Sequence, residues 1–431
     1  MIGRRAFLAA MLGGASAAAL GRVPYGGTLR LKVPWPITGI DPHALDDATA
    51  ALFGPAIAEP LFALDGAGRP YPTLAAAMPE ATPRGARLAL RPFLNTAKGV
   101  ALDARDVLFS LARARRSGAL GLLSGFAEAI ADPGDGLAVI VPGADPSALA
   151  GALASPIVAL LPRNFSRLTP DATGPFLATP ARGALLLQRN AKAARGPAFL
   201  STIEVRQAVD LADALRSFEA GDTDVGWLGA GYHRPRPGAL RFDAGAFGWA
   251  VLRTGRDAGS WGAPGVAQRL LDTVPPSRLS HLALHGLPAV SGNSGWGGPS
   301  AELLVVDDAP HLIEIGKALA AILSQPGHEL TLALRPRREI EQRRGSGQFA
   351  LLVDFVRSIG PPGRATLLAL LTAADPALAR RAPRLGDFDA RAIARTLPLG
   401  VIGELRIAGA HVPEVHALGE FNLGSVWLKR G

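Results

Sequence analysis

Short stretches in which apolar and polar residues alternate recur along the chain, and they predict strands. In Thr28–Val33 the side chains of Leu29, Leu31 and Val33 fall on one face, which is typical of a half-buried strand. Alternation of this kind, or a short apolar run, predicts further strands at residues 86–91, 137–141, 203–207, 224–228, 302–306, 329–334 and 349–355.

Apolar residues at helical spacing follow several of these strands. Asp103 and Asp106 resemble a capping box, and the apolar stripe behind them at 107–114 predicts a helix. Asp210 precedes a second apolar stripe, and Pro310 stands in the first turn of a third. We therefore expect helices to begin close to these three positions.

The order of these elements predicts the fold class. Strand, helix and strand follow one another at 203–228 and again at 302–334. Two such units indicate an α/β protein with two lobes. In folds of this kind a ligand site is expected at the carboxyl ends of the strands, between the lobes.

The first nineteen residues have the pattern of an export signal. Arg4 and Arg5 are followed by a short apolar stretch that ends in small residues. That stretch is shorter than the roughly 20 apolar residues that a membrane-spanning helix needs. The paired arginines fit the twin-arginine route, and an ordinary Sec signal that carries two arginines is the alternative. We expect residues 1–19 to be removed and the mature protein to be soluble in the periplasm.

The composition narrows the class of protein. The chain of 431 residues is 48% hydrophobic and 19% charged, so it can bury a sizeable core. It contains no cysteine, which excludes disulfides, thiolate metal sites and a lipid-modified N-terminal cysteine. Its 45 basic and 36 acidic residues are interspersed, so the net charge of +9 indicates a basic surface and no nucleic-acid partner.

Residues that could carry catalysis or bind a metal form no complete motif. His281 and His285 have the spacing of two zinc ligands on one helix, but no third ligand stands nearby. The arginines at 335–344 are interleaved with Glu339 and Glu341, which indicates a solvated face. No nucleophile and base occur at a known spacing. We expect no enzyme activity, no metal and no cofactor.

Short motifs occur in a fixed order along the chain. Residues 40–43 read Ile-Asp-Pro-His, 102–107 read Leu-Asp-Ala-Arg-Asp-Val, and 173–176 read Thr-Gly-Pro-Phe. Leu-Gln-Arg-Asn follows at 187–190 and Ala-Gly-Asp-Thr-Asp-Val at 220–225. Together they resemble family 5 extracellular solute-binding proteins, the dipeptide-, oligopeptide- and nickel-binding components of ABC importers. The resemblance extends over roughly residues 26–430.

The resemblance implies the two-lobed periplasmic binding protein fold, with hinge crossovers and an enlarged first lobe, and it implies a domain division and partners. A first lobe would comprise residues 26–246 plus 401–431, and a second lobe, shortened relative to the family, residues 247–400. The chain would cross between them near Gly248 and near Leu399. A monomeric protein of this family delivers its small-molecule solute, peptide-like or less polar, to an ABC permease and ATPase complex in the inner membrane.

One departure from the family bears on the solute. Peptide-binding members carry an aspartate in the second lobe that pairs with the amino group of the peptide, and Ser358 aligns with that aspartate. A serine can accept a hydrogen bond but cannot neutralise a buried ammonium group. Asp354, four residues earlier, is a possible substitute. Free di- and tripeptides are therefore expected to bind weakly, and a neutral, amine-blocked or less polar solute to bind better.

Candidate ligand contacts come from two segments that we expect to face each other across the cleft. They are Trp35, Pro36, Ile37 and Thr38 after the first strand, and Asp354, Phe355, Arg357 and Ser358 in the second lobe. Trp249, Trp261 and Trp296 are further candidates because they lie in loops or at lobe edges.

Three functional classes remain open. The first is the solute-binding component of an ABC importer, and the second is a ligand sensor or degenerate binding protein without a transport role. The third is an exported enzyme on a similar scaffold. The genes next to this one would separate the first two, and a screen of hydrolase activities would test the third.

Overall fold

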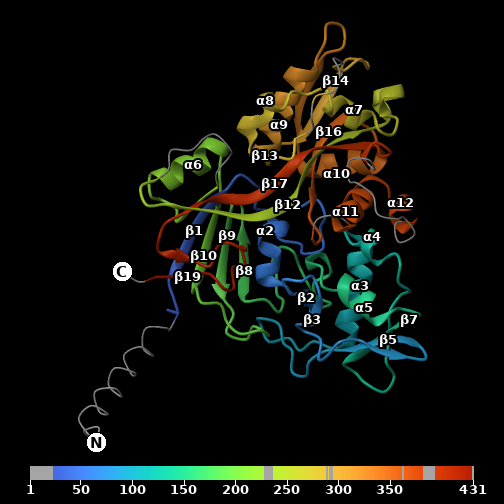
Figure 1. Cartoon of the computed structure of the whole chain (residues 1–431), viewed down its shortest axis with the longest axis vertical. Helices are drawn as coiled ribbons and strands as arrows, with labels where there is room; N and C mark the ends of the chain where they lie inside the picture. The colour runs from blue at the N-terminus through green and yellow to red at the C-terminus, as the bar shows by residue number, and fades with distance from the viewer. Residues whose placement is uncertain are drawn as a thin grey trace, which may run out of the picture.

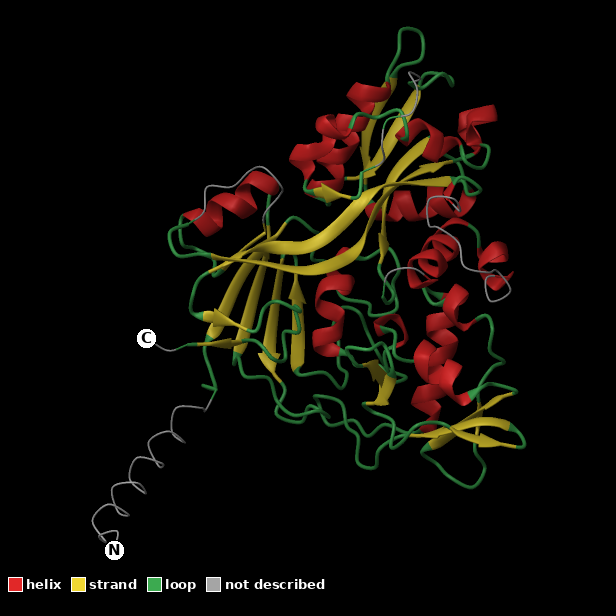
Figure 2. Ribbon diagram, viewed as in Figure 1, coloured by secondary structure: helices red, strands yellow, loops and turns green. Residues whose placement is uncertain are grey.

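The structure is a computed structural model and describes residues 23–227, 236–287, 290, 295–361, 364–381 and 394–429. The expected export signal, with Arg4 and Arg5, lies outside the described residues. One large, curved sheet runs through most of the molecule, and helices cover it (Figures 1 and 2). In the part of the chain that the structure describes, none of the helices has both the length and the apolar character needed to cross a membrane.

The large sheet follows the strand order β15-β14-β16-β12-β17-β11-β1-β10-β9-β8, and β13 also pairs with β17. Its strands are β1 (Thr28–Val33), β8 (Phe176–Ala181), β9 (Ala184–Arg189), β10 (Thr202–Gln207), β11 (Val225–Trp227), β12 (Leu240–Thr254), β13 (Leu284–His285), β14 (Ala301–Val306), β15 (Leu330–Arg335), β16 (Leu351–Arg357) and β17 (Leu399–His411).

Smaller sheets lie apart from it. They are formed by β2 (Phe62–Leu64) with β3 (Pro70–Pro72), by β4 (Glu80–Thr82), β5 (Gly85–Ala89), β6 (Ile130–Ala131) and β7 (Ala138–Pro142), and by β18 (Val415–His416) with β19 (Trp427–Leu428).

The described helices are α2 (Ala48–Ile57), α3 (Ala104–Arg116), α4 (Leu120–Leu123), α5 (Pro146–Ala152), α6 (Leu211–Glu219), α7 (Val266–Leu271), α8 (Pro276–Leu279), α9 (Pro310–Leu323), α10 (Arg337–Ser346), α11 (Arg364–Ala374) and α12 (Pro376–Arg381). Short 3-10 helices occupy Pro156–Val158, Arg256–Gly262 and Ser280–Leu282.

Both predicted strand–helix–strand units are present. Strands β10 and β11, joined through α6, run parallel to β1 on its two sides, and β14 and β15, joined through α9, are parallel neighbours. The helix starts are also confirmed. Asp103 and Asp106 form a complete capping box on α3, the carboxylate of Asp210 caps α6, and α9 begins at Pro310. Local signals of this kind identify elements because they act within one turn of the chain.

Two long antiparallel strands join the two ends of the sheet. β12 and β17 pair from Leu240 opposite His411 to Arg253 opposite Leu399, with shifts in register between Asp243 and Gly248 and between Ala250 and Val251. At one end β17 also pairs with β11, and at the other end β12 pairs with β16 (Figure 1). The crossings expected near Gly248 and Leu399 fall inside β12 and at the start of β17. The lobe boundaries themselves stay a prediction.

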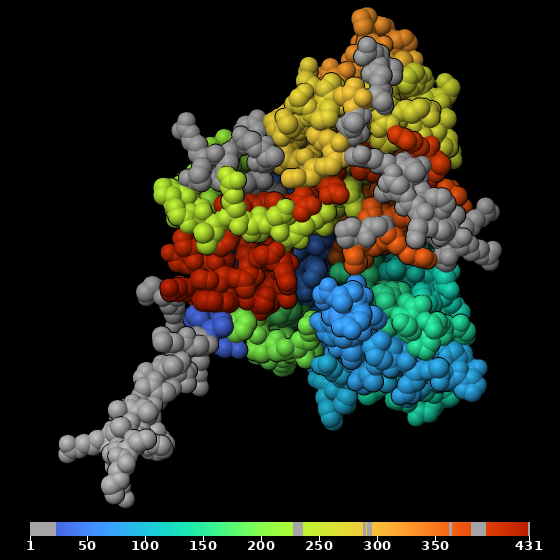
Figure 3. Space-filling model, viewed as in Figure 1, coloured from blue at the N-terminus to red at the C-terminus, as the bar shows by residue number. Residues whose placement is uncertain are grey.

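The C-terminal residues lie against the first part of the chain. A Cβ at Gly27 would lie 2.8 Å from the side chain of Leu428, and one at Gly424 would lie 3.2 Å from that of Pro175. In the space-filling view the red C-terminal segment accordingly sits beside the blue and green segments (Figure 3). The chain end is thereby fixed to segments that precede it by more than 200 residues.

Two groups of buried apolar residues lie on opposite faces of the large sheet. Along β12, Ala250 and Leu252 belong to one group, and Trp249 and Val251 belong to the other. Since neighbouring side chains of a strand point to opposite faces, the sheet separates the two groups. The second group also joins residues of α3 and α5 to residues of α11, so its packing connects segments more than 200 positions apart.

The glycine of the Thr-Gly-Pro-Phe turn is required by a close backbone approach. A Cβ at Gly174 would lie 2.5 Å from the carbonyl carbon of Ile57 and 2.7 Å from the carbonyl oxygen of Ala56. The amide of Gly174 donates to the Ile57 carbonyl at 3.0 Å, and Asn190 Nδ2 donates to the Gly174 carbonyl at 2.8 Å. The turn is thereby fixed to the end of α2.

We expect Gly174→Ala to lower the free energy of unfolding by about 1–3 kcal/mol, because the added methyl group must displace backbone atoms. The control is Gly66→Ala, at which a Cβ would meet no atom within 4 Å. Chemical denaturation of both variants measures the difference. Equal stability of the two variants would contradict the close approach.

Candidate binding cavity

A cavity of about 1150 Å³ lies between the loop after β1 and the helix α10. Residues 36–47 contribute one wall, together with Ser117 and Arg167. The facing wall is formed by the loop after β12 and by the end of α10, and residues near the end of α11 also line the cavity. Its volume exceeds the 300–1,000 Å³ that is usual for sites of small ligands.

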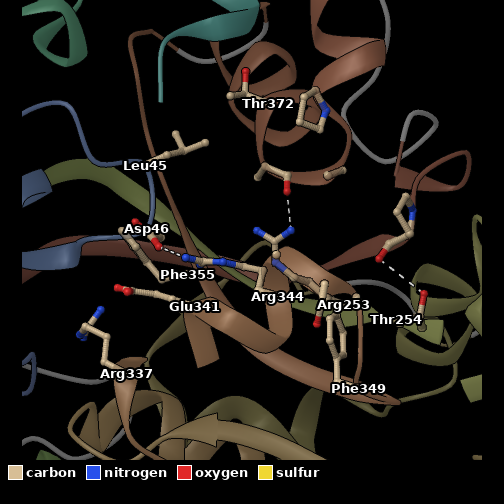
Figure 4. Close-up of a pocket in the computed structure, with 18 of the residues that line it drawn as sticks. Leu45, Asp46, Arg253, Thr254, Arg337, Glu341, Arg344, Phe349, Phe355 and Thr372 are labelled. Atoms are coloured by element: carbon tan, nitrogen blue, oxygen red, sulfur yellow. Dashed lines mark hydrogen bonds and ion pairs between the residues drawn. The ribbon is translucent and has the colours of Figure 1, made fainter. Parts of the chain in front are cut away.

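The lining combines apolar surface with many charges, several of which are seen in Figure 4. The acidic residues are Asp41, Asp46, Asp47 and Glu341, and the basic residues are Arg167, Arg253, Arg256, Arg337 and Arg344. The apolar residues include Pro36, Leu45, Phe349, Phe355 and Pro398.

A chain of ion pairs connects the two walls. Nε of Arg253 donates to Oδ2 of Asp354 at 2.8 Å, and Nη1 of Arg344 donates to the same oxygen at 3.1 Å. The other end of the Arg344 guanidinium pairs with Asp46 on the first wall (Figure 4). Arg253 also donates to the carbonyl oxygen of Ala373 in α11. These contacts fix α10, α11 and the loop after β1 relative to one another.

Burial and charge shift the pKa values of two aspartates in opposite directions. Burial alone would raise the pKa of Asp354, but the guanidinium groups of Arg344 and Arg253 hold it below its usual range. Burial raises the pKa of Asp47 to about 6, although its carboxylate accepts a hydrogen bond from the backbone N–H of Ala50. Asp354 is therefore anionic at neutral pH, whereas Asp47 begins to take up a proton in mildly acidic solution.

Arg357 of β16 holds the loop after β1 in place from the buried side of the loop, away from the cavity. Its side chain is only 2% exposed, and its Nη1 donates to the carbonyl oxygen of Pro42 at 2.7 Å. Its backbone N–H donates to the Leu45 carbonyl, also at 2.7 Å. Burial lowers the pKa of this arginine to about 10, which leaves it charged. The segment that carries Asp41, Asp46 and Asp47 is thus fastened to β16.

The structure brings together only some of the residues predicted for the site. Pro36, Thr38 and Phe355 line the cavity. Trp35 is 1% exposed and packs against Phe247, His311 and Phe355, with ring centroids 5.1–5.8 Å apart. Ile37 is fully buried in the same apolar group, and Arg357 is buried behind the loop. The loop after β1 and the segment at 354–358 face each other, as predicted, and they are in direct contact. The cavity therefore lies beside this contact and not between the two segments.

Neither residue considered for binding an amino group is available to a solute. Ser358 is not among the residues that line the cavity. Its hydroxyl donates to the Gly360 carbonyl oxygen at 3.1 Å, and its backbone N–H donates to the Phe247 carbonyl oxygen at 2.8 Å. Asp354 is 7% exposed and is occupied by two arginines. The carboxylate that was expected as a substitute is therefore neutralised by the chain itself.

The three tryptophans proposed from the second half of the chain also lie elsewhere. Trp249 is buried in the apolar group on one face of β12. Trp261 and Trp296 pack together with ring centroids 5.1 Å apart, and Nε1 of Trp296 donates to the Pro299 carbonyl at 2.8 Å. None of them is among the described residues that line the cavity.

The charged residues of the cavity were not predicted from the sequence. Arg337 and Arg344 were assigned to a solvated face, but they are half-buried and pair with Asp308 and Asp46. That assignment is wrong for these two arginines, because α10 places them toward the cavity. The adjacent acidic residues at 46 and 47, just before a helix, were the available signal.

The histidine pair does not form half of a metal site. His281 lies in the 3-10 helix at Ser280–Leu282, whereas His285 lies in β13, so they share no helix face. Within the described residues, no group of three or more histidine, aspartate or glutamate side chains is placed to hold a metal ion.

The fold is that of two-lobed periplasmic binding proteins, as the sequence predicted. Solved structures of family 5 solute-binding proteins superpose on nearly the whole chain. The oligopeptide-binding protein AppA of Bacillus subtilis, in complex with a nonapeptide, has a TM-score of 0.73 at 13% identity and covers 95% of this chain and 100% of its own.

Two further structures show the same fold with other ligands. AgaA of A. tumefaciens R10, in complex with agropinic acid, has a TM-score of 0.70 at 15% identity over 94% of this chain and 99% of its own. NikA of Brucella suis, in complex with Fe(III)-EDTA, has a TM-score of 0.63 at 16% identity over 94% and 100%. No protein-family model matches the sequence, and no curated protein matches it.

We expect Asp354→Asn to lower the free energy of unfolding by about 3–5 kcal/mol, because it leaves two half-buried or buried arginines without their shared carboxylate. The matched control is Glu302→Gln, which removes a carboxylate that pairs with Arg335 at 2.7 Å but is 46% exposed. Its loss should cost less than about 1 kcal/mol. Denaturant titration compares the two, and a similar small loss in both would show that the buried network contributes little.

Proposed function

We propose that this chain is an exported solute-binding protein that delivers a small solute to an ABC permease and ATPase complex in the inner membrane. The observation that carries the proposal is the large cavity whose walls come from both ends of a two-lobed fold. Solved proteins with this fold bind a nonapeptide, agropinic acid and a metal chelate. We infer that the chain acts as a monomer and not as an enzyme.

Solute binding would be coupled to movement of the lobes. We infer a first lobe of residues 26–246 plus 401–431 and a second lobe of residues 247–400. A solute in the cavity would contact Thr38 on one wall and Phe349 on the other. A solute shifts the population of a closed state only when it binds that state more tightly than the open state. Contacts with both walls provide this difference, and the closed form is what the permease recognises.

The solute is expected to lack a free amino group. Ser358 carries no charge, and Asp354 is already paired with arginines. The charged lining favours an amine-blocked solute over a weakly polar one, because charged walls bind an apolar group poorly. A ligand sensor without a transport role remains the second candidate, since the same cavity serves either purpose.

A leucine side chain can be placed in the cavity by one substitution in α10. Gly345 lines the cavity, lies in the last turn of the helix, and a Cβ there would meet no atom within 4 Å. Leucine is also a better helix former than glycine, by roughly 0.5–0.8 kcal/mol. We expect Gly345→Leu to fold normally and to lose solute that the wild-type protein retains on purification.

Native mass spectrometry of proteins purified without denaturation measures that loss. The control is Gly151→Leu, which makes the same change in α5, at an exposed position where a Cβ likewise meets nothing within 4 Å. It should retain solute as the wild type does. An identical bound mass in Gly345→Leu and the control would place the solute away from the part of the cavity that Gly345 lines.

We further propose that residues 1–19 direct export to the periplasm through the twin-arginine route. Replacing Arg4 and Arg5 by lysine should then stop processing of the precursor, because the paired arginines are the recognised signal. Immunoblotting of cell fractions separates precursor from mature protein. Unchanged processing of the double variant would assign the signal to the Sec route.

A further inference from the structure

The carboxylates around the cavity are compensated by arginines of the chain itself. Asp41 accepts hydrogen bonds from both terminal nitrogens of Arg113, at 2.8 and 2.7 Å. Asp46 pairs with Arg344, and Asp354 is held by two guanidinium groups. An ammonium group entering the cavity would have to displace an arginine to gain a carboxylate partner, which removes its electrostatic advantage.

Two acidic side chains are not paired in this way. Asp47 caps α2 by accepting the Ala50 N–H at 3.0 Å, which uses one of its oxygens. Glu341 is exposed and has no hydrogen bond or ion pair with another described residue. In Figure 4, Glu341 lies on the same side of the cavity as Asp46 and Arg337. Glu341 is thus an acidic side chain of the lining that no described arginine pairs with, whereas Asp47 lies within the electrostatic reach of Arg337 and Arg357.

Two arginines of the lining have unused donors. Arg167 comes from the first wall and Arg256 from the loop after β12 on the facing wall, and both are exposed. Neither side chain forms an ion pair or a hydrogen bond with any residue in the part of the chain that the structure describes. A guanidinium group offers five N–H donors in a planar fork that matches a carboxylate.

Glycines keep the space around Arg256 open. A Cβ at Gly347, where φ is +71°, would lie 3.4 Å from Nε of Arg256, so a larger residue would crowd the guanidinium stem. A Cβ at Gly259, in the same loop as Arg256, would meet nothing within 4 Å. Gly347 therefore leaves the side chain of Arg256 uncrowded on that side.

We propose that this cavity recognises its solute by a carboxylate group, bound by Arg256 with Arg167 contributing from the facing wall, and that it requires no free amine. The inference rests on the proposed solute-binding function and names the class of solute. A carboxylate and a guanidinium form two parallel charge-assisted hydrogen bonds, which are stronger than bonds between neutral groups. Because the arginines come from different walls, an anion that contacts both favours the closed form.

Tetra-alanine with its ends blocked in different ways tests this recognition. The four probes are the free peptide, the N-acetylated peptide, the C-amidated peptide and the peptide blocked at both ends, titrated into the intact mature protein by calorimetry. We expect the N-acetylated peptide to bind at least as tightly as the free one. Amidation of the carboxylate should weaken binding by about tenfold or more, since one charge-assisted pair is lost.

Arg256→Gln and Arg167→Gln assign the effect to these residues. In Arg256→Gln the amidated and free-carboxylate peptides should bind equally, and Arg167→Gln should reduce the difference. The control is Arg278→Gln, which changes an exposed arginine of α8 that does not line the cavity. It should preserve the wild-type preference. Thermal unfolding of each variant confirms that the fold is unchanged.

Three outcomes would overturn the inference. If N-acetylation of the peptide abolishes binding and amidation does not, the protein recognises the amino group and not the carboxylate. If Arg256→Gln still prefers the free carboxylate to the amide, Arg256 is not the residue that binds the carboxylate. If none of the four peptides binds, a carboxylate on a peptide-sized solute is not sufficient. The solute-binding function itself is judged separately, by the mass retained in wild type and lost in Gly345→Leu.

Discussion

The buried guanidinium of Arg357 determines where the first wall of the cavity stands. An arginine that is almost completely removed from water is stabilised only if its donors meet acceptors, and here they meet the carbonyl oxygen of Pro42. The acceptors belong to a loop with no regular backbone pairing of its own, so the loop is held by its contacts with β16. Asp46 and Asp47, which follow directly, are thereby set opposite α10. Arg344 of α10 then pairs with Asp46 of the loop and with Asp354 of β16, so the ion pairs join all three elements.

The sequence was informative where structure is local. The capping box at Asp103, the cap at Asp210 and the alternating strands act over a few residues, and they were found with small errors at their ends. Helix α10 was not predicted because only Ile340 is buried on it, so it shows no apolar stripe. Its arginines look solvated in the sequence, and only the tertiary fold turns two of them toward the cavity.

The site was predicted in outline but not in its residues. The resemblance to a two-lobed family predicted that the loop after β1 lies opposite the segment at 354–358. The structure places them opposite each other and in contact. The tryptophans were predicted as ligand contacts because of their expected places in loops or at lobe edges, yet Trp35, Trp249 and Trp296 are buried in the core and do not line the cavity. A large aromatic side chain reaches either environment from a loop, and the choice depends on neighbours that are distant in sequence, such as Phe247 and Phe355 for Trp35.

The pairing of β12 with β17 has a consequence for how the two lobes relate during folding. Each of these strands supplies backbone hydrogen bonds at both ends of the large sheet, and the apolar group on one face contains residues from both lobes. Neither lobe could be cut from the chain without leaving a sheet edge exposed and a core half-covered. The two ends of the sheet therefore depend on each other for folding, and the protein should gain or lose its folded state as one cooperative body.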